Sequence, residues 1–177
     1  MSNSTMEAAP KTVAMSVQNT LRDLANKTRY TVGVNIEGLT HAESLTQPQP
    51  AGNCSNWVLG HLLTVYSKTL PMFGGKPVIG PDRLKHYERG SAPLLDAHDA
   101  IPFDELVAAW NTTCNMVDAG ISQVSDEMLL QPVPESPTNN PNETVHSLLF
   151  TIMFHQAYHS GQLGVLRRVA GKDGAIK

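Results

Sequence analysis

The chain has 177 residues, of which 41% are hydrophobic, and its formal net charge is −3. These values fit one globular domain with a continuous core. The basic residues are dispersed, so no nucleic-acid surface is indicated, and no apolar run approaches the ~20 residues of a membrane span. Residues 1–10 are polar and lack the pattern of a secretory signal. We therefore expect a flexible N-terminus over residues 1–10 and a single cytoplasmic domain over residues 11–177.

Apolar residues recur at helical spacing in four segments, at about 13–45, 53–73, 102–124 and 142–170. Proline and glycine break the chain at 46–52, and four prolines make a loop of 131–141. The connection over 75–101 is long, rich in proline, glycine and charge, and has no strand alternation. Short first and last connections with a long middle one predict an all-α four-helix bundle, in which the second and third helices run parallel.

Two histidines stand four residues apart in the fourth predicted helix. His155 and His159 share a face with Ile152 and Leu163, so both rings are expected to point into the bundle. Buried neutral imidazoles need partners, and a shared cation is one solution. The spacing alone is a weak signal, because seven histidines in a chain of this length give such a pair by chance in roughly one comparable sequence in four.

A third histidine, His61, lies in the apolar interior of the second predicted helix, directly after Gly60. A lone histidine there is more often a hydrogen-bonded core residue than a ligand. Taken with the pair, it completes a set of three neutral nitrogens. Such a set leaves coordination positions open, as in catalytic metal sites, and suits Zn²⁺, Ni²⁺, Fe²⁺ or Mn²⁺.

The other four histidines are weaker candidates. His41 is expected near the C-terminal end of the first helix, where it would be solvated and favour the helix dipole. His86 and His98 fall in the long connection, and His146 falls on a different face of the fourth helix from the pair.

The motifs resemble those of the DinB/YfiT-like superfamily of metal-binding four-helix bundles. The clearest match is FHQAYHSGQLGVLRR at 154–168, and the second is NWVLGHLL at 56–63. A more diffuse match leads from Ser125 through the proline-rich loop into Thr144. The resemblance covers about residues 15–171 and implies that His61, His155 and His159 are the metal ligands.

Three functions follow from this resemblance and stay open. In the first, the metal activates a small thiol, such as mycothiol, bacillithiol or glutathione, for transfer to an electrophilic substrate. In the second, the metal activates water for hydrolysis, although no carboxylate base stands near the three histidines in sequence and only Glu37 could reach them through the fold. In the third, the chain is a metal-binding stress or regulatory protein without turnover. We slightly favour thiol transfer. The exposed helix faces of a bundle also allow a homodimer, but no apolar line in the sequence fixes its symmetry.

Several other residues could serve the site. Gln162, Tyr66 and Tyr158 could hydrogen-bond a ligand or substrate, although packing explains each of them as well. Arg167 and Arg168 could bind an anion or only solvate a helix end. Cys54 precedes a helix, where a thiol pKa can be lowered, but an unreactive loop cysteine is the better reading, and Cys114 falls in an apolar stripe typical of the core.

Overall fold

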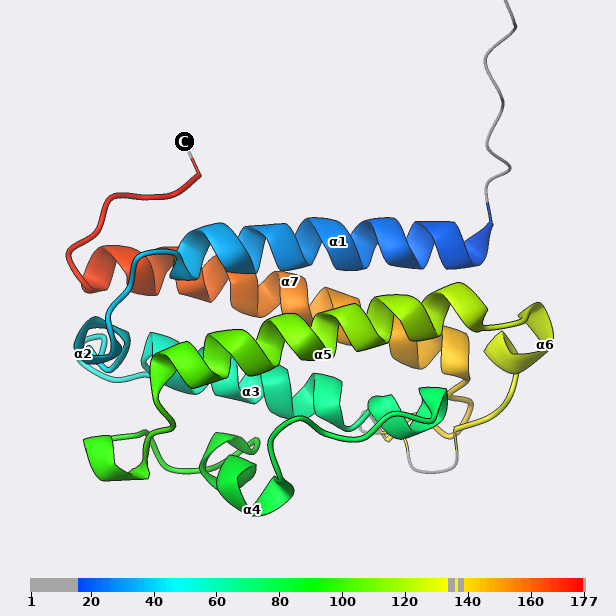
Figure 1. The fold of residues 1–177 in the computed structure, drawn as a ribbon, viewed down its shortest axis with the longest axis horizontal. Coiled ribbons are helices and arrows are strands. Elements are labelled where there is room, and N and C mark those ends of the chain that lie inside the picture. Colours follow the sequence, from blue (N-terminus) through cyan, green and yellow to red (C-terminus); the bar gives the residue numbers. More distant parts are fainter. Residues whose placement is uncertain (1–15, 134–135, 137–138, 177) are drawn as a thin grey trace, which may run out of the picture.

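The computed structural model describes residues 16–133, 136 and 139–176, so the predicted flexible segment 1–10 lies outside the described residues. Four long helices form the bundle: α1 (Val17–Ile36), α3 (Ser55–Ser67), α5 (Phe103–Gln123) and α7 (Val145–Val169). Helices α1 and α3 each pack against both α5 and α7. Figure 1 shows that α3 and α5 run in one direction, while α1 and α7 run in the other. The predicted helical bundle with parallel second and third helices is confirmed.

The first helix is shorter than predicted. Helix α1 ends at Ile36, and Gly38 then adopts a left-handed φ of 70° that turns the chain. A separate short helix, α2 (His41–Ser44), follows. Thr40 and Glu43 form a capping box at its start, each side chain bonded to the other residue's backbone N–H. Apolar spacing continues across this break, so the sequence alone predicts one helix over both segments.

The second predicted helix also divides, and the long connection after it is more structured than expected. Helix α3 ends at Ser67, and a 3₁₀ turn, η1 (Leu70–Phe73), follows it. Three further short helical turns lie in the connection between η1 and α5. They are α4 (Pro81–Leu84), η2 (Lys85–Tyr87) and η3 (Ala97–Asp99).

Tyr87 fixes this connection to α3. Its side chain is fully buried, and its hydroxyl donates to Asn56 Oδ1 at 2.9 Å and accepts from the Ile101 N–H at 2.7 Å. Asn56 also donates to the Ile101 carbonyl oxygen at 3.0 Å. The middle and the end of the crossover are therefore held on one buried asparagine of α3.

The last connection contains α6 (Asp126–Leu129), and Thr144 caps α7 by accepting from the Ser147 N–H. This capping agrees with the predicted start of the fourth helix at 142–144. None of the helices in the described part of the chain combines the length and hydropathy needed to cross a membrane.

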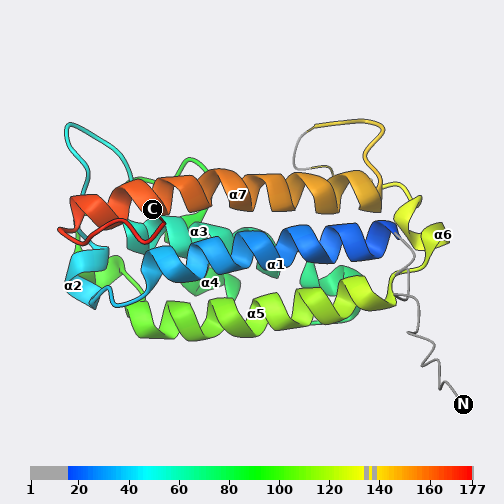
Figure 2. The same ribbon diagram turned by 90° about the horizontal axis from the view of Figure 1, so that it is seen from above.

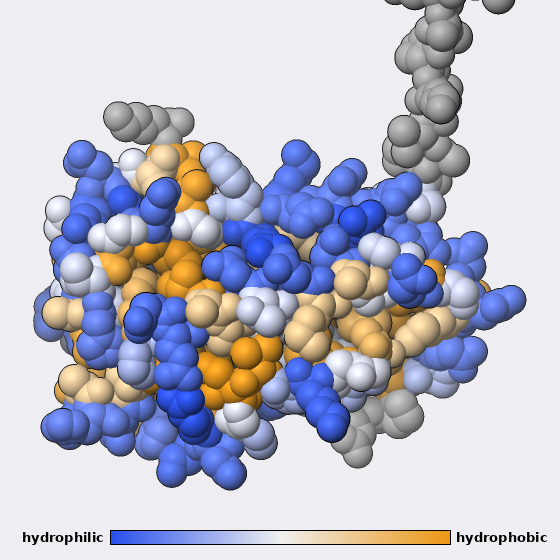
Figure 3. Space-filling view, in the orientation of Figure 1, coloured by the Kyte–Doolittle hydropathy of each residue, from blue (hydrophilic) through white to orange (hydrophobic). Residues whose placement is uncertain are grey.

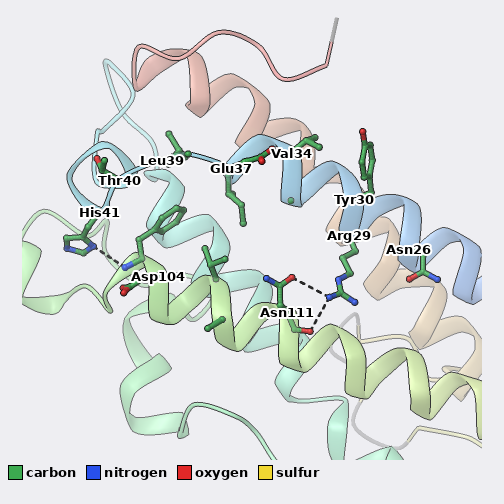
Figure 4. A pocket seen from close by; sticks show the side chains of 16 residues that line it. Asn26, Arg29, Tyr30, Val34, Glu37, Leu39, Thr40, His41, Asp104 and Asn111 are labelled. Carbon is green, nitrogen blue, oxygen red and sulfur yellow. Dashed lines mark hydrogen bonds between the residues drawn. The ribbon is translucent and has the colours of Figure 1, made fainter.

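A surface groove of about 1090 Å³ runs between the second half of α1 and the first half of α5. Figure 3 shows apolar side chains gathered over this part of the bundle. Figure 4 shows polar side chains on its border, among them Arg29, Glu37, His41 and Asn111. Arg29 spans the groove by donating to Asn111 and to Asn115.

Candidate metal centre

Three histidines from two helices meet inside the bundle. His61 comes from the middle of α3, and His155 and His159 come from the middle of α7. The Nε2 atom of His155 lies 3.2 Å from Nε2 of His61 and 3.0 Å from Nε2 of His159. One nitrogen of each ring lies within 4.8 Å of the others, and no other group of three or more potential ligand residues of this kind is found among the described residues.

Hydrogen bonds on the far side of two rings fix their tautomers. His61 Nδ1 lies 2.8 Å from the Tyr87 carbonyl oxygen, which can only accept, so Nδ1 carries the proton. His159 Nδ1 lies 2.6 Å from Gln162 Oε1, which likewise accepts. In both neutral rings Nε2 is therefore a bare lone pair, and both lone pairs face His155.

This arrangement is poorly satisfied by protein atoms alone. A proton on His155 Nε2 could bond to one of the two facing lone pairs, but the other contact would still join two nitrogens without a proton between them. His155 Nδ1 is also buried and has no hydrogen-bond partner among the described residues. A cation that accepts all three lone pairs removes both problems, so the donor set fits a divalent transition metal.

Burial keeps the three rings uncharged at neutral pH. Desolvation is the largest cause that lowers the pKa of each ring, and for His155 the neighbouring His159 and His61 lower it further, to about 4. The Gln162 side chain partly opposes the fall for His159. Neutral imidazoles are the form that binds a metal, so no proton has to leave before coordination at pH 7.

The residue that orients His61 was not predicted. It is Tyr87, in the crossover, and the contact is made by its backbone carbonyl. Gly60 makes this approach possible, because a Cβ atom at residue 60 would lie 2.1 Å from Cδ1 of the Tyr87 ring. The sequence shows Gly60 next to His61, but it carries no signal for a main-chain acceptor 26 residues away.

Trp57 also supports the site and was missed as a site residue. Its ring stacks on His61, with centroids 4.8 Å apart and planes 10° apart. Its indole Nε1 donates to the carbonyl oxygen of His86 at 2.9 Å, which ties the same part of the crossover to α3. Trp57 is four residues before His61, and this spacing on one helix face was the available signal.

The three residues predicted to support the ligands differ in whether they contact the three histidines. Gln162 contacts His159 directly, as described above. Tyr158 is exposed and presents its ring edge-on to His159, with centroids 5.2 Å apart. Tyr66 hydrogen-bonds Gln156 in the core and packs on Trp110, so the structure records no contact between Tyr66 and the three histidines.

The remaining histidines lie elsewhere. His41 begins α2 rather than ending the first helix, and its Nδ1 accepts from the Phe103 N–H at 3.2 Å. His98 and His146 are exposed, and His86 lies half-buried in η2. None of these four is part of the group at His61.

Two other suggested roles do not fit the structure. Arg167 donates to the carbonyl oxygens of Asn35, Glu37 and Asp173, so it joins the end of α1 to the segment after α7 rather than facing a ligand pocket. Glu37 lines the groove between α1 and α5 and is not in the histidine group (Figure 4).

The cysteines are buried and free. Burial raises the pKa of Cys54, and it raises that of Cys114 to about 12. Neither thiol is therefore available as a thiolate near neutral pH.

Comparisons with known proteins support the fold through a solved structure and show the family through a family model. A crystal structure of a conserved protein from Enterococcus faecalis matches with a TM-score of 0.69 and 16% identity, over 90% of this chain and 100% of that chain. A search of curated proteins found no match. The family model described as mycothiol-S-transferase matches residues 20–171. This chain is accordingly a member of the mycothiol-S-transferase family, within the DinB/YfiT-like superfamily that its motifs resemble.

Proposed function

We propose that this chain is a metal-dependent S-transferase that joins a small thiol to an electrophilic substrate. The observation that carries the proposal is the meeting of three Nε2 atoms, two of them with tautomers fixed as bare lone pairs, in a member of a thiol-transferase family. His61, His155 and His159 would hold one Zn²⁺, Ni²⁺, Fe²⁺ or Mn²⁺ ion. A divalent ion held there lowers the pKa of a bound thiol and so supplies a thiolate at neutral pH.

The chain itself orients and shields the site. The Tyr87 carbonyl and Gln162 hold two ligand rings in the binding tautomer, and Trp57 keeps the His61 ring from rotating by stacking on it. Tyr158 and Gln162 are exposed beside these rings, so they are the side chains best placed to meet a substrate.

The reacting sulfur would come from a bound small thiol. Both cysteines of the chain are buried and have raised pKa values, so the protein offers no thiolate of its own. In the transfer the thiol would lose its proton to solvent, its sulfur would form a bond to an electrophilic carbon, and the leaving group would depart with the electron pair of the broken bond. The family description favours mycothiol, and bacillithiol and glutathione are the alternatives to compare. Free cysteines agree with a reducing compartment, so we infer a cytoplasmic site of action.

The hydrolase reading has less support. Activating water requires a general base within hydrogen-bond reach. In the described part of the chain no carboxylate joins the histidine group, and Glu37 lines a groove formed by other helices. A metal-binding protein without turnover differs from the proposed enzyme only in activity, and the experiment below separates the two.

The test uses full-length protein purified without a histidine tag. We expect about one divalent metal ion per chain by elemental analysis. We also expect metal-dependent consumption of mycothiol in the presence of a fluorogenic electrophile. His155→Ala should abolish both. His146→Ala is the matched control, because His146 is an exposed histidine of the same helix outside the group.

Two results would count against the proposal. Protein that takes up no metal after reconstitution would remove the metal site. If metal binds normally but none of the three thiols is consumed faster than by His155→Ala, the chain is a metal-binding protein without enzymatic activity.

A further inference from the structure

The outer face of α7 is apolar although it is exposed. No Asp, Glu, Lys or Arg occurs between Val145 and Leu166, which is about six helical turns. Phe150, Phe154, Tyr158 and Val165 are between 53% and 63% exposed on this face. Among the other exposed large apolar side chains of the described residues, Val169 ends α7 and Ile176 borders one pocket with Ala157, Gly161 and Val165, while the rest lie on other elements. Figure 2 shows α7 along one edge of the bundle, with α5 along the opposite edge.

These residues form a regular seam, which we call the α7 stripe. It consists of Phe150, Phe154, Ala157, Tyr158, Gly161 and Val165, all of which are exposed. Phe150, Phe154, Ala157, Gly161 and Val165 are successively four or three residues apart, the spacing with which one helix presents a line of side chains to another, and Tyr158 lies beside Ala157. Such a line is typical of a helix that packs against a further helix.

No contact inside the described part of the chain requires glycine at residue 161. A Cβ atom built on it meets nothing within 4 Å, and its φ is not left-handed. Glycine weakens a helix interior relative to alanine, so its presence in the middle of α7 calls for a reason. By contrast, a Cβ atom on Gly60 would collide with the Tyr87 ring. Close approach by something outside the chain is a reason that fits Gly161.

The order of large and small residues along the stripe is self-complementary. In an antiparallel pair of α7 helices centred between Ala157 and Tyr158, residues equally far from the centre stand at the same height. Phe154 then faces Gly161 of the second copy, and these two residues are seven apart, so they lie on one line of the helix. Phe150 likewise stands level with Val165. Each large aromatic residue therefore meets a smaller one.

We propose that the α7 stripe is the interface of a homodimer, in which two copies of α7 pack antiparallel about a two-fold axis between Ala157 and Tyr158. A second copy fits better than a membrane surface, because the basic residues that flank the stripe, Arg167 and Arg168, lie at one end of it only, and Arg167 donates to carbonyl oxygens of the chain itself. The area also fits. With 150–250 Å² per aromatic side chain, the exposed parts of Phe150, Phe154 and Tyr158 amount to roughly 350 Å² in each copy, almost half of the ~800 Å² of a standard interface.

The interface would adjoin the histidine group. Tyr158 lies beside the proposed axis and contacts His159 with its ring edge. The two Tyr158 side chains of the dimer would therefore lie near each other, and each would border a metal centre. This inference stands independently of the chemistry proposed for that centre.

The first test measures mass in solution. Sedimentation equilibrium of the untagged full chain should give twice the 19.2 kDa of one copy, and Phe154→Glu should give one copy. Leu130→Glu is the control, since Leu130 is 73% exposed but outside the stripe. Wild-type protein with the mass of one copy at every concentration up to 100 µM, or a dimer that survives Phe154→Glu unchanged, overturns the proposal. Binding of single copies to neutral phosphatidylcholine vesicles also overturns it, in favour of a lipid partner.

A size exchange tests the register. Phe154→Ala and Gly161→Phe should each weaken the dimer by at least about tenfold, because one opens a gap and the other brings two rings together. The double variant, which exchanges large and small, should recover most of the loss. Loss in the double variant equal to the sum of the two single losses contradicts the register. Circular dichroism melting of each variant shows whether it is folded.

A cysteine variant provides a test that does not depend on breaking the interface. Ala157→Cys would place two thiols across the axis and should give a disulfide-linked dimer on mild oxidation. Ala119→Cys, an exposed position on α5, is the matched control and should not. Equal cross-linking of both variants, or none at residue 157, contradicts the proposed axis.

Discussion

We expect the substitution Gly60→Ala to disturb both the crossover and the proposed metal centre. The added Cβ atom would lie 2.1 Å from Cδ1 and 2.4 Å from Cε1 of Tyr87, whereas ordinary contact begins at 3.4 Å. The ring must therefore move by more than about 1 Å. It is fully buried, and its hydroxyl is held at 2.9 Å by Asn56 and at 2.7 Å by the Ile101 N–H.

The expected loss of stability follows from three contributions. Overpacking costs about 1–3 kcal/mol. The two hydrogen bonds of the Tyr87 hydroxyl contribute about 1 kcal/mol each. The better helix propensity of alanine returns about 1 kcal/mol. The net fall in the free energy of unfolding is about 2–4 kcal/mol. Movement of residue 87 also withdraws the carbonyl that orients His61, and loss of such a support lowers metal affinity by about 10–100-fold.

Urea unfolding followed by circular dichroism measures the first effect, and competition with a chromophoric chelator measures the second. Gly33→Ala is the matched control, because Gly33 is an exposed residue within α1 whose added Cβ meets nothing within 4 Å. We expect this control to gain about 0.5–1 kcal/mol. If Gly60→Ala leaves both stability and metal affinity at the wild-type values, the argument from Tyr87 is refuted.

Three further predictions concern other parts of the molecule. Gln162→Leu removes the acceptor at one ligand ring and should lower metal affinity about 10–100-fold in the same chelator assay, with little change in unfolding. The backbone N–H of Thr40, and then Lys172, lower the pKa of Glu43 from 4.5 to about 2, so its stabilising effect is full above pH 4.5 and is lost as pH falls towards 2. The difference in Tm between wild type and Glu43→Gln should accordingly shrink between about pH 5 and about pH 3; a constant difference would contradict this pKa. Because Cys54 and Cys114 are buried with raised pKa values, iodoacetamide at pH 8 should label neither in the folded protein and both in urea, as read by mass spectrometry.

The sequence predicted the four long helices because each carries a sustained apolar period. The start of α7 agreed closely, since Thr144 is a good cap. The break in the first helix was missed because apolar spacing continues through Gly38 into α2, although the Thr40–Glu43 capping box was legible as a start signal.

The spacing of His155 and His159, the apolar setting of His61 and the family resemblance together led us to expect these three residues in one place, and the structure brings them together. That they bind a metal stays a prediction. The place of Tyr66 could not be predicted, because hydrogen bonding to Gln156 depends on how α3 and α7 are rotated. The role of the Tyr87 carbonyl could not be predicted for a different reason. Every residue has a main-chain carbonyl, so the sequence does not mark the one that accepts from His61.

The contact between His61 and the crossover has a practical consequence for protein engineering. Because it is a main-chain contact, the acceptor persists whatever side chain occupies residue 87, provided that the path of the backbone is kept. The crossover is held at residues 86 and 87 and again at Ile101, so the exposed positions of the segments 76–84 and 88–100 can be redesigned while the buried Ile79, Leu84 and Leu94 are kept. Loop libraries that explore the proposed transfer with new electrophiles would vary those two segments and leave Gly60 and the course of the chain at residue 87 unchanged.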